Sequence, residues 1–336
     1  MDRPLVSILI PCYQEEKTIG RLLAAIRAQT FPLDRMEVLV ADGFSTDRTR
    51  EMIELFNRTL PELDVRILDN PKRIIPAALN LCIQASQGEI LLRLDGHSLP
   101  SPDYVSTCVR LLADGKGDMV GGVWHVEPGD DSWQARSIAA AASHPVGVGD
   151  AYYRWAITAR EVDTLAFWAF SKAWIDRVGL FDETLRSNED YDFNSRFRAA
   201  GGRIWLDPSV ACVYYARSRF GALTRQYLRY GFWKGEVARR SPRTLRWRQV
   251  LPPMALLASI LLGALGLWNP AYLEVFLGVV LAYLLMLFGV GVQQASKRMD
   301  PMLVLGVPLA ICTMHLSWAG AFLWSFPAAF LARRHA

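Results

Sequence analysis

LVSILIPCYQEEKTIGRLLAAIRAQT, residues 5–30, joins a continuous apolar run to a segment with helical periodicity. Residues 5–10 have the Val- and Ile-rich character of a strand that is buried on both faces. In residues 15–30, apolar side chains recur every three or four positions, as in an amphipathic helix. The alternation continues with predicted strands and helices at 37–41, 45–60, 64–68, 76–86 and 89–94. Repeated strand–helix–strand units imply an α/β fold with a mainly parallel sheet covered on both faces.

Polar side chains follow three of the predicted strands, at the edge where open α/β sheets bind their ligands. Tyr13 and Glu15 follow the first strand, and Asp42 follows the second. Asp95 and His97 follow the fourth strand, and residues two apart in an extended segment point to the same side. A polar turn is the structural alternative for this last pair. Taken together, the strand ends predict one cleft that offers an aromatic ring and several carboxylates.

A divalent metal ion is the simplest partner for a phosphate at this edge. The chain has no GxGxxG after its early strands and no GxxxxGK[ST], so dinucleotide and P-loop sites are disfavoured. Mg²⁺ and Mn²⁺ bind carboxylate and imidazole ligands together with substrate phosphates. The sequence therefore predicts Mn²⁺ or Mg²⁺ at Asp95 and His97.

Four motifs in order and spacing carry a family resemblance: SILIPCYQEEKTI (7–19), VADGFSTDRT (40–49), LRLDGHS (92–98) and SNEDYDFNSRFRAAGGRIWLDP (187–208). Over about residues 5–248, the chain resembles a family 2 glycosyltransferase of the Rossmann-like GT-A fold. Within that family it is most similar to membrane-attached bacterial exopolysaccharide enzymes of the succinoglycan ExoA type. The resemblance implies a GT-A domain at 1–220.

The resemblance also implies roles at the nucleotide-sugar site. Tyr13 and Glu15 would contact the base, and Asp42 the base or ribose. The family's Asp-x-Asp motif, which holds the metal and diphosphate, reads Asp95-Gly96-His97 here. Histidine at its last position is a competent ligand that titrates near pH ~6.5 when unperturbed, so we expect a preference for manganese and loss of metal at low pH.

A pair of acids, Glu189 and Asp190, forms the second candidate site. Asn188 is a good helix N-cap, and Gly201 with Gly202 ends the predicted helix. By resemblance, Asp190 is the general base and Glu189 orients the acceptor. The structural alternative is that both acids merely complement the helix dipole.

Further candidates lie in two other stretches. Arg73 reaches the nucleotide or a phosphate, or is an ordinary surface arginine. Gln226, Arg229 and Tyr230 match the family's Gln-x-x-Arg-Trp motif, with Tyr in place of Trp, which implies contact with the diphosphate and acceptor. The alternative is an amphipathic helix at the membrane surface.

The C-terminal part differs sharply in composition from the rest of the 336 residues. Residues 250–268 and 302–331 carry no charge, and 272–292 carry only Glu274. A transmembrane helix needs roughly 17–25 apolar residues, so the first two segments fit single spans, and the third is either one tilted helix or a broken one. We therefore expect a membrane domain at 250–332 with two to three hydrophobic segments.

Charge points to a cytoplasmic catalytic domain. A basic interfacial region at 221–249 precedes the first segment and fits the positive-inside rule and anionic lipid; its basic residues are Arg225, Arg229, Lys234, Arg239, Arg240, Arg243, Arg246 and Arg248. Lys297 and Arg298 fit a cytoplasmic loop, whereas Arg333 and Arg334 fit poorly after three spans. Since the net charge of +4 comes largely from this region, we expect no nucleic-acid partner. The start reads as a strand, so no signal peptide is expected.

The predicted function is therefore inverting transfer of a single sugar in exopolysaccharide synthesis at the bacterial inner membrane. The resemblance implies a UDP-sugar donor, UDP-glucose first, a β-linked product, and a polyprenyl-diphosphate-linked saccharide as acceptor. Three alternatives stay open: a processive polysaccharide synthase, a polyprenyl-phosphate sugar synthase, and a degenerate nucleotide-binding membrane scaffold without enzyme activity.

Overall fold

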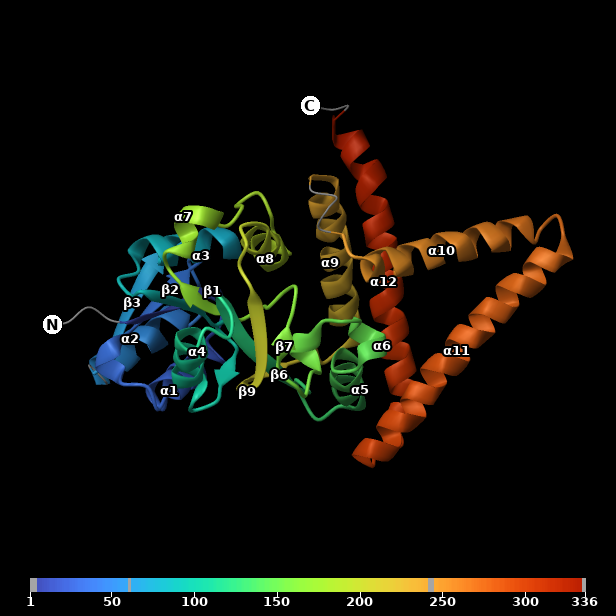
Figure 1. Ribbon diagram of the computed structural model, residues 1–336. Helices are drawn as coiled ribbons and strands as arrows, with labels where there is room; N and C mark the ends of the chain where they lie inside the picture. The colour runs from blue at the N-terminus through green and yellow to red at the C-terminus, as the bar shows by residue number, and fades with distance from the viewer. Residues whose placement is uncertain (1–4, 60–61, 241–244, 334–336) are drawn as a thin grey trace. The chain divides into compact units, whose positions relative to one another are not determined.

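The computed structural model of the chain describes residues 5–59, 62–240 and 245–333. Two of the basic residues singled out above, Arg243 and Arg334, lie outside this described part. The chain divides into two compact units (Figure 1). We call Met1–His125 with Tyr152–Tyr214 the sheet unit, and Val126–Ala151 with Tyr215–Ala336 the helical unit.

The sheet unit is built on a nine-stranded sheet in the order β3-β2-β1-β4-β8-β6-β9-β5, with β7 paired to β9. The strands are β1 (Val6–Cys12), β2 (Met36–Asp42), β3 (Asp64–Asp69), β4 (Ile90–Arg93), β5 (Leu99–Pro100), β6 (Met119–Glu127), β7 (Arg160–Glu161), β8 (Ala169–Ser171) and β9 (Ile204–Tyr215). The first four strands pair in parallel, as the alternation predicts. Beyond β4 the pairing turns antiparallel, since β8 runs against both β4 and β6. The expected α/β fold is confirmed, with a mixed sheet.

Helices cover both faces of this sheet. They are α1 (Ile19–Arg27), α2 (Thr49–Thr59), α3 (Ile75–Ala85), α4 (Tyr104–Ala113), α7 (Trp174–Val178) and α8 (Glu189–Ala199), with short 3₁₀ turns at Leu33–Arg35 and Tyr152–Arg154. Side chains of β1 alternate between the faces, so Ile8 packs with α1, α2 and α4 while Leu9 packs with α3, α7 and α8. Burial on both faces explains why the first strand is apolar at almost every position, with Ser7 as the polar exception.

Helix α8 begins directly after Asn188, and Gly201 and Gly202 follow its end, as predicted. The cap itself differs from the prediction. Asn188 is left-handed, with φ 64°, and its side chain makes no cap hydrogen bond. A side-chain N-cap typically has an extended backbone, so Asn188 occupies the predicted N-cap position without the cap hydrogen bond that asparagine usually provides.

The helical unit consists of α5 (Trp133–Ala142), α6 (Pro145–Val148), α9 (Phe220–Arg240), α10 (Trp247–Leu265), α11 (Pro270–Arg298) and α12 (Leu303–Arg333). By length and composition, α11 and α12 could each cross a membrane, whereas α10 is shorter. The segment predicted at 302–331 is one continuous helix that contains Pro308 and Pro327, so a break there is excluded.

Candidate functional site

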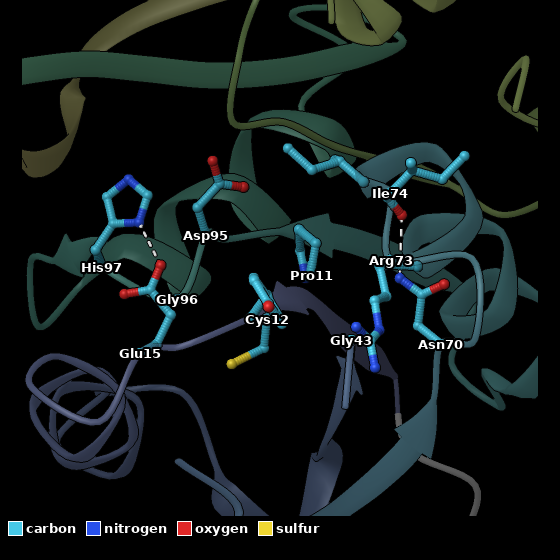
Figure 2. Close-up of a pocket in the computed structure, with 13 residues that line it drawn as sticks. Pro11, Cys12, Glu15, Gly43, Asn70, Arg73, Ile74, Asp95, Gly96 and His97 are labelled. Atoms are coloured by element: carbon cyan, nitrogen blue, oxygen red, sulfur yellow. Dashed lines mark hydrogen bonds and ion pairs between the residues drawn. The ribbon is translucent and has the colours of Figure 1, made fainter. Parts of the chain in front are cut away.

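The carboxyl ends of β3, β2, β1 and β4 form a row along one edge of the sheet. From β1 the chain runs outward to β3 and then returns to β4 on the other side, which makes β1 and β4 the switch point where such sheets bind ligands. A pocket with a volume of about 170 Å³ lies there, and Figure 2 draws the residues that line it. Its lining residues are Pro11, Cys12, Tyr13, Glu15, Gly43, Asn70, Arg73, Ile74, Ile75, Ala78, Asp95, Gly96 and His97.

The pocket thus brings together five of the residues predicted from sequence: Tyr13, Glu15, Arg73, Asp95 and His97. Sites for drug-sized ligands typically enclose ~300–1,000 Å³, so this smaller volume suits one portion of a larger ligand. The Tyr13 side chain is 49% exposed and lies against Gly43, where an added Cβ would come within 3.1 Å of the ring.

Asp42 is not among the lining residues, and its side chain is fully buried. Its carboxylate accepts hydrogen bonds from the Ser45 backbone N–H at 3.0 Å and the Ser45 hydroxyl at 2.6 Å. The Arg50 guanidinium lies 3.7 Å away. Asp42 therefore shapes the loop that carries Gly43 into the pocket.

Backbone strain gathers in the loops that border the site. Gln14, Phe44 and Arg73 have φ values of 57°, 57° and 52°, left-handed conformations that residues other than glycine rarely adopt. Asn188, next to the acidic pair, shares this conformation. The Arg73 guanidinium lies over the Phe44 ring, 5.9 Å from its centroid.

Asn70 is a site residue that the sequence reasoning missed. It follows β3, is only 3% exposed, and donates from Nδ2 to the carbonyl of Ile74 at 3.1 Å. Its buried Oδ1 has no hydrogen-bond partner within the described residues. The available signal in the sequence was a polar residue directly after the third predicted strand. The unsatisfied oxygen fits a ligand that donates a hydrogen bond.

Glu15 and His97 form a pair across the pocket, marked in Figure 2. The Glu15 Oε1 lies 3.0 Å from His97 Nδ1, and its Oε2 accepts from the Thr18 hydroxyl at 2.6 Å. A carboxylate on one ring nitrogen fixes the orientation of a metal-binding histidine. Glu15, expected at the base, thus contacts the candidate metal ligand.

The donor set fits a divalent metal whose remaining ligands come from substrate and water. In the part of the chain that the structure describes, no group of three or more His, Cys, Asp and Glu side chains is placed to hold a metal by itself. Asp95 and His97 line one pocket and offer an oxygen and a nitrogen. Mg²⁺ and Mn²⁺ sites commonly combine one or two protein ligands with phosphate oxygens and water.

A buried arginine, Arg93 on β4, joins the two candidate sites. It is 4% exposed, donates from Nε to Asp95 Oδ1 at 3.0 Å, and donates from Nη2 to Glu189 Oε1 at 3.3 Å. Burial lowers the pKa of Arg93, but the carboxylates of Asp95 and Glu189 outweigh it and raise that pKa overall. The guanidinium therefore stays charged. Sequence reasoning missed it, although an arginine inside an apolar strand was a visible signal.

The acidic pair differs in burial. Glu189 is 6% exposed, and desolvation, then repulsion from Asp190, raises the pKa of Glu189 to about 7 against the opposing effect of Arg93. Asp190 is half-buried, and its Oδ1 accepts from the Tyr191 backbone N–H at 2.7 Å. Glu189 is therefore held by the protein interior, while Asp190 keeps access to solvent.

Gln226, Arg229 and Tyr230 lie on α9 of the helical unit. Gln226 is buried and donates from Nε2 to the Tyr230 hydroxyl at 2.9 Å. The Arg229 guanidinium lies 5.7 Å from the centre of the Tyr230 ring. The three predicted residues thus form one cluster on one helix.

Comparison with known proteins identifies a matching family and relatives that cover most of the chain. The family model described as Glycosyl transferase family 2 matches residues 7–179, just over half of the chain. The succinoglycan biosynthesis protein ExoA of Rhizobium meliloti is 32% identical over 320 residues, covering 94% of this chain and 93% of the relative. Glycosyltransferase AglE of Haloferax volcanii is 30% identical, covering 70% of this chain and 73% of the relative.

Among solved structures, the mannosyltransferase PcManGT from Pyrobaculum calidifontis, in complex with GDP-Man and Mn²⁺, has a TM-score of 0.61. The match covers 93% of this chain and 88% of that one at 21% identity. It confirms the GT-A fold expected from the motifs.

Proposed function

The chain belongs to glycosyltransferase family 2, and from that premise we propose that it transfers one sugar from a nucleotide-sugar donor to a lipid-linked saccharide. One observation carries the proposal. Arg93 contacts both Asp95, at the pocket, and Glu189, beside the proposed base. A donor diphosphate near Asp95 and an acceptor hydroxyl near Asp190 would then be placed around a single buried cation.

The pocket holds the nucleotide in this proposal. Tyr13 provides an exposed ring for the base to stack on, and Asn70 Oδ1 accepts a hydrogen bond from the base. Arg73 contributes positive charge at the rim, and Asp42 positions the loop at Gly43 for the ribose. For Gln226, Arg229 and Tyr230, the family motif implies contact with the diphosphate and the acceptor.

Asp95 and His97 hold the metal with the donor diphosphate, and Glu15 orients His97. The ion, when bound, neutralises charge that develops on the leaving diphosphate. PcManGT is described with Mn²⁺, which supports manganese for this chain.

Asp190 is the general base. It removes the proton from the acceptor hydroxyl, whose oxygen forms a bond to the anomeric carbon as the bond from that carbon to the diphosphate oxygen breaks. Attack from the face opposite the diphosphate inverts the anomeric centre, so an α-linked donor gives a β-linked product. The partial exposure of Asp190 supports this role, because the base must reach an incoming substrate. Glu189, fixed by Arg93, positions Asp190 and the acceptor.

The acceptor and location follow from relatives and composition. One relative is named for succinoglycan biosynthesis, which supports a role in polysaccharide synthesis. UDP-glucose as the donor and a polyprenyl-diphosphate-linked saccharide as the acceptor are what the family resemblance implies. The apolar helices α11 and α12 support attachment to a membrane. We propose that this is the bacterial inner membrane, and the basic residues before α10 favour a cytoplasmic sheet unit.

The test is nucleotide release by the full-length protein purified in detergent. A panel of UDP- and GDP-sugars is supplied with manganese, magnesium or chelator, with and without native membrane lipid extract. Asp190→Asn is the loss-of-base variant. Asp192→Asn is its matched control, because Asp192 lies on the same helix and pairs with Arg196 at 2.9 Å.

We expect metal-dependent UDP release that Asp190→Asn abolishes and Asp192→Asn retains. Nucleotide binding without turnover, even with lipid extract, would support the scaffold alternative and overturn the enzyme proposal. Products longer than one added sugar would indicate a processive synthase, and undiminished activity of Asp190→Asn would indicate transfer to a bare lipid phosphate.

A further inference from the structure

The two long apolar helices differ in their surroundings. In the most apolar 18-residue window of α11, 17% of the residues are buried, against 39% for α12. Large apolar side chains are exposed along α11, including Leu277, Leu281, Leu284, Leu285 and Phe288. Exposed apolar surface on this scale requires a partner, and α12 already has part of its surface covered by neighbouring helices.

Helix α12 packs closely on α9. A Cβ on Gly231 would come within 2.1 Å of the Trp318 carbonyl oxygen, and one on Gly235 within 1.8 Å of Ser325 Oγ. Arg239 Nη1 donates to the Ser325 carbonyl at 3.1 Å. Glycines at 231 and 235 bring the helix backbones together, so the two helices share one depth relative to any membrane.

Helix α9 is charged along its length. Arg225, Arg229 and Arg240 are exposed, and Glu236 forms an ion pair with Arg239. At 1.5 Å per residue, Arg225 and Arg240 are about 22 Å apart. Each charge costs about 2.5–3.5 kcal/mol at the centre of a bilayer, so α9 stays outside the hydrocarbon. Since α12 is packed on α9, it does not cross the hydrocarbon either.

The turn between α11 and α12 is held by hydrogen bonds to α5 and the residues that follow α5. Arg136 of α5 donates from Nε to Asp300 Oδ2 at 2.7 Å. His144 Nε2 lies 3.1 Å from Gln293 Oε1, and Arg298 Nη2 donates to Ser143 Oγ at 3.3 Å. The end of α11 is therefore held on the same side of a membrane as α5 and α9.

Helix α10 starts on that side as well and leads to an exposed apex. The Arg246 guanidinium, at its N-cap, lies 3.9 Å from the Asp150 carboxylate. Figure 1 shows α10 and α11 as the two arms of a V that meets at residues 266–269. Leu267 and Trp268 at this apex are 85% and 81% exposed. With 19 residues, α10 is about 28 Å long, against a hydrocarbon core of about 30 Å.

We infer that the membrane-crossing element is the α10–α11 hairpin, with its apex at the opposite headgroups, and that α12 lies along the membrane surface beside α9. This inference deepens the membrane placement proposed above and rests on it. The exposed apolar residues Leu305, Leu309 and Leu316 of α12 then face lipid from the interface. Both ends of the hairpin, with their arginines, lie on the cytoplasmic side, as the positive-inside rule requires. The end of α12 at Arg333 lies there too, which removes the conflict that three spans would create.

The test measures which side of the membrane each of three matched sites faces. Ile157→Cys, Leu267→Cys and Met299→Cys place cysteines at residues that are 89%, 85% and 88% exposed. A membrane-impermeant maleimide is applied to sealed inside-out and right-side-out membrane vesicles that contain the full-length protein. The parent chain carries Cys312→Ser, because the other four cysteines are buried and Cys312 is not.

We expect Ile157→Cys and Met299→Cys to react from one side and Leu267→Cys only from the other. Crossing by α11 and α12 instead would reverse the sides of the Leu267 and Met299 sites and overturn the inference. Protection of Leu267→Cys from both sides would also overturn it. Release of the protein by a carbonate wash would overturn the membrane placement as well, whereas UDP release tests the transferase proposal separately.

Spin labels give a second, independent measure of depth. Leu284→Cys and Leu316→Cys lie near the middle of α11 and α12, at residues that are 50% and 51% exposed. We expect the label on α11 at the bilayer centre and the label on α12 at headgroup depth. Equal depth at both positions would refute the surface placement of α12.

Discussion

Two arginine–glutamate pairs, each with a buried glutamate, lie at opposite edges of the same sheet. At the amino edge, Glu37 is 1% exposed and pairs with Arg66. Its Oε1 also accepts from the Ser7 hydroxyl and the Gln87 backbone N–H, both at 2.5 Å. Several donors thus surround a single carboxylate, and the pair locks β1, β2 and β3 together.

At the carboxyl edge the balance is reversed. Arg93 is one buried cation facing the carboxylates of Asp95, Glu189 and Asp190. Repulsion and desolvation raise the pKa of Glu189 to about 7. At the amino edge, where hydrogen-bond donors are in excess, the arginine–glutamate pair makes the sheet rigid. At the carboxyl edge, where acids are in excess, the same two residue types give a reactive site.

The largest expected effect is the loss of the base at the reactive edge. Asp190→Asn should lower kcat by about 10²–10⁴-fold, the usual contribution of general-base catalysis, with an unchanged melting temperature. Single-turnover product formation separates this effect from donor binding. A kcat within a few-fold of the parent would show that the reaction needs no hydroxyl base at Asp190, as expected for transfer to a bare lipid phosphate.

One substitution at each edge of the sheet gives the sharpest contrast between the two arginine–glutamate pairs. Arg93→Met removes the cation shared by Asp95 and Glu189 and should cost about 3–5 kcal/mol of stability as well as most activity. Glu37→Gln should cost about 1–3 kcal/mol and leave kcat per folded molecule unchanged. Urea unfolding combined with UDP-release assays measures both quantities.

Arg93→Lys completes that comparison, because it keeps the charge but loses the forked geometry that reaches two carboxylates. It should recover most of the stability and only part of the kcat. Full recovery of kcat would show that turnover depends on the positive charge at residue 93 and not on the bridge between Asp95 and Glu189.

The pKa of Glu189 makes the stability of the reactive edge depend on pH. It is about 7 in the folded chain against an ordinary 4.5, so between these values the folded state binds more protons than the unfolded state. Stability therefore falls as pH rises through this window, by at most about 1.4 kcal/mol per unit. Glu189→Gln removes this loss. Thermal unfolding from pH 5 to 8 should show the variant gaining on the parent, and a constant difference would contradict the raised pKa.

The smallest effect is expected at the nucleotide. Asn70→Ala should raise KM for the donor about 3–10-fold through loss of one hydrogen bond, with kcat preserved. Asn57→Ala is the control, since Asn57 Oδ1 also has no hydrogen-bond partner within the described residues but lies outside the pocket. Equal KM values for both variants would remove Asn70 from donor binding.

Local sequence patterns predicted the first half of the fold because its contacts are local. Strands β1 to β4 and their helices follow from apolar periodicity, and their parallel pairing follows from the crossovers between them. The insertion of β8 between β4 and β6 depends on contacts between distant segments, which no short motif encodes. The same holds for the packing of α12 on α9.

The candidate site was predictable where strand ends carry it and unpredictable where tertiary contacts make it. Tyr13, Asp95 and His97 share a pocket because adjacent parallel strands end together. Arg93 became a site residue only when the start of α8, 96 positions away, came to lie beside it. The contact of Glu15 with His97 likewise depends on two loops that meet in space.

The left-handed residues around the pocket have a consequence for directed evolution. Gln14, Phe44, Arg73 and Asn188 all hold this conformation, which costs a residue other than glycine or asparagine about 1 kcal/mol or more. A library screened for heat tolerance will accumulate glycine or asparagine at the first three of these positions, since such changes relieve the strain without disturbing the core. The thermostable clones will also have softer loops around the donor, so stability and turnover will trade against each other at these positions first.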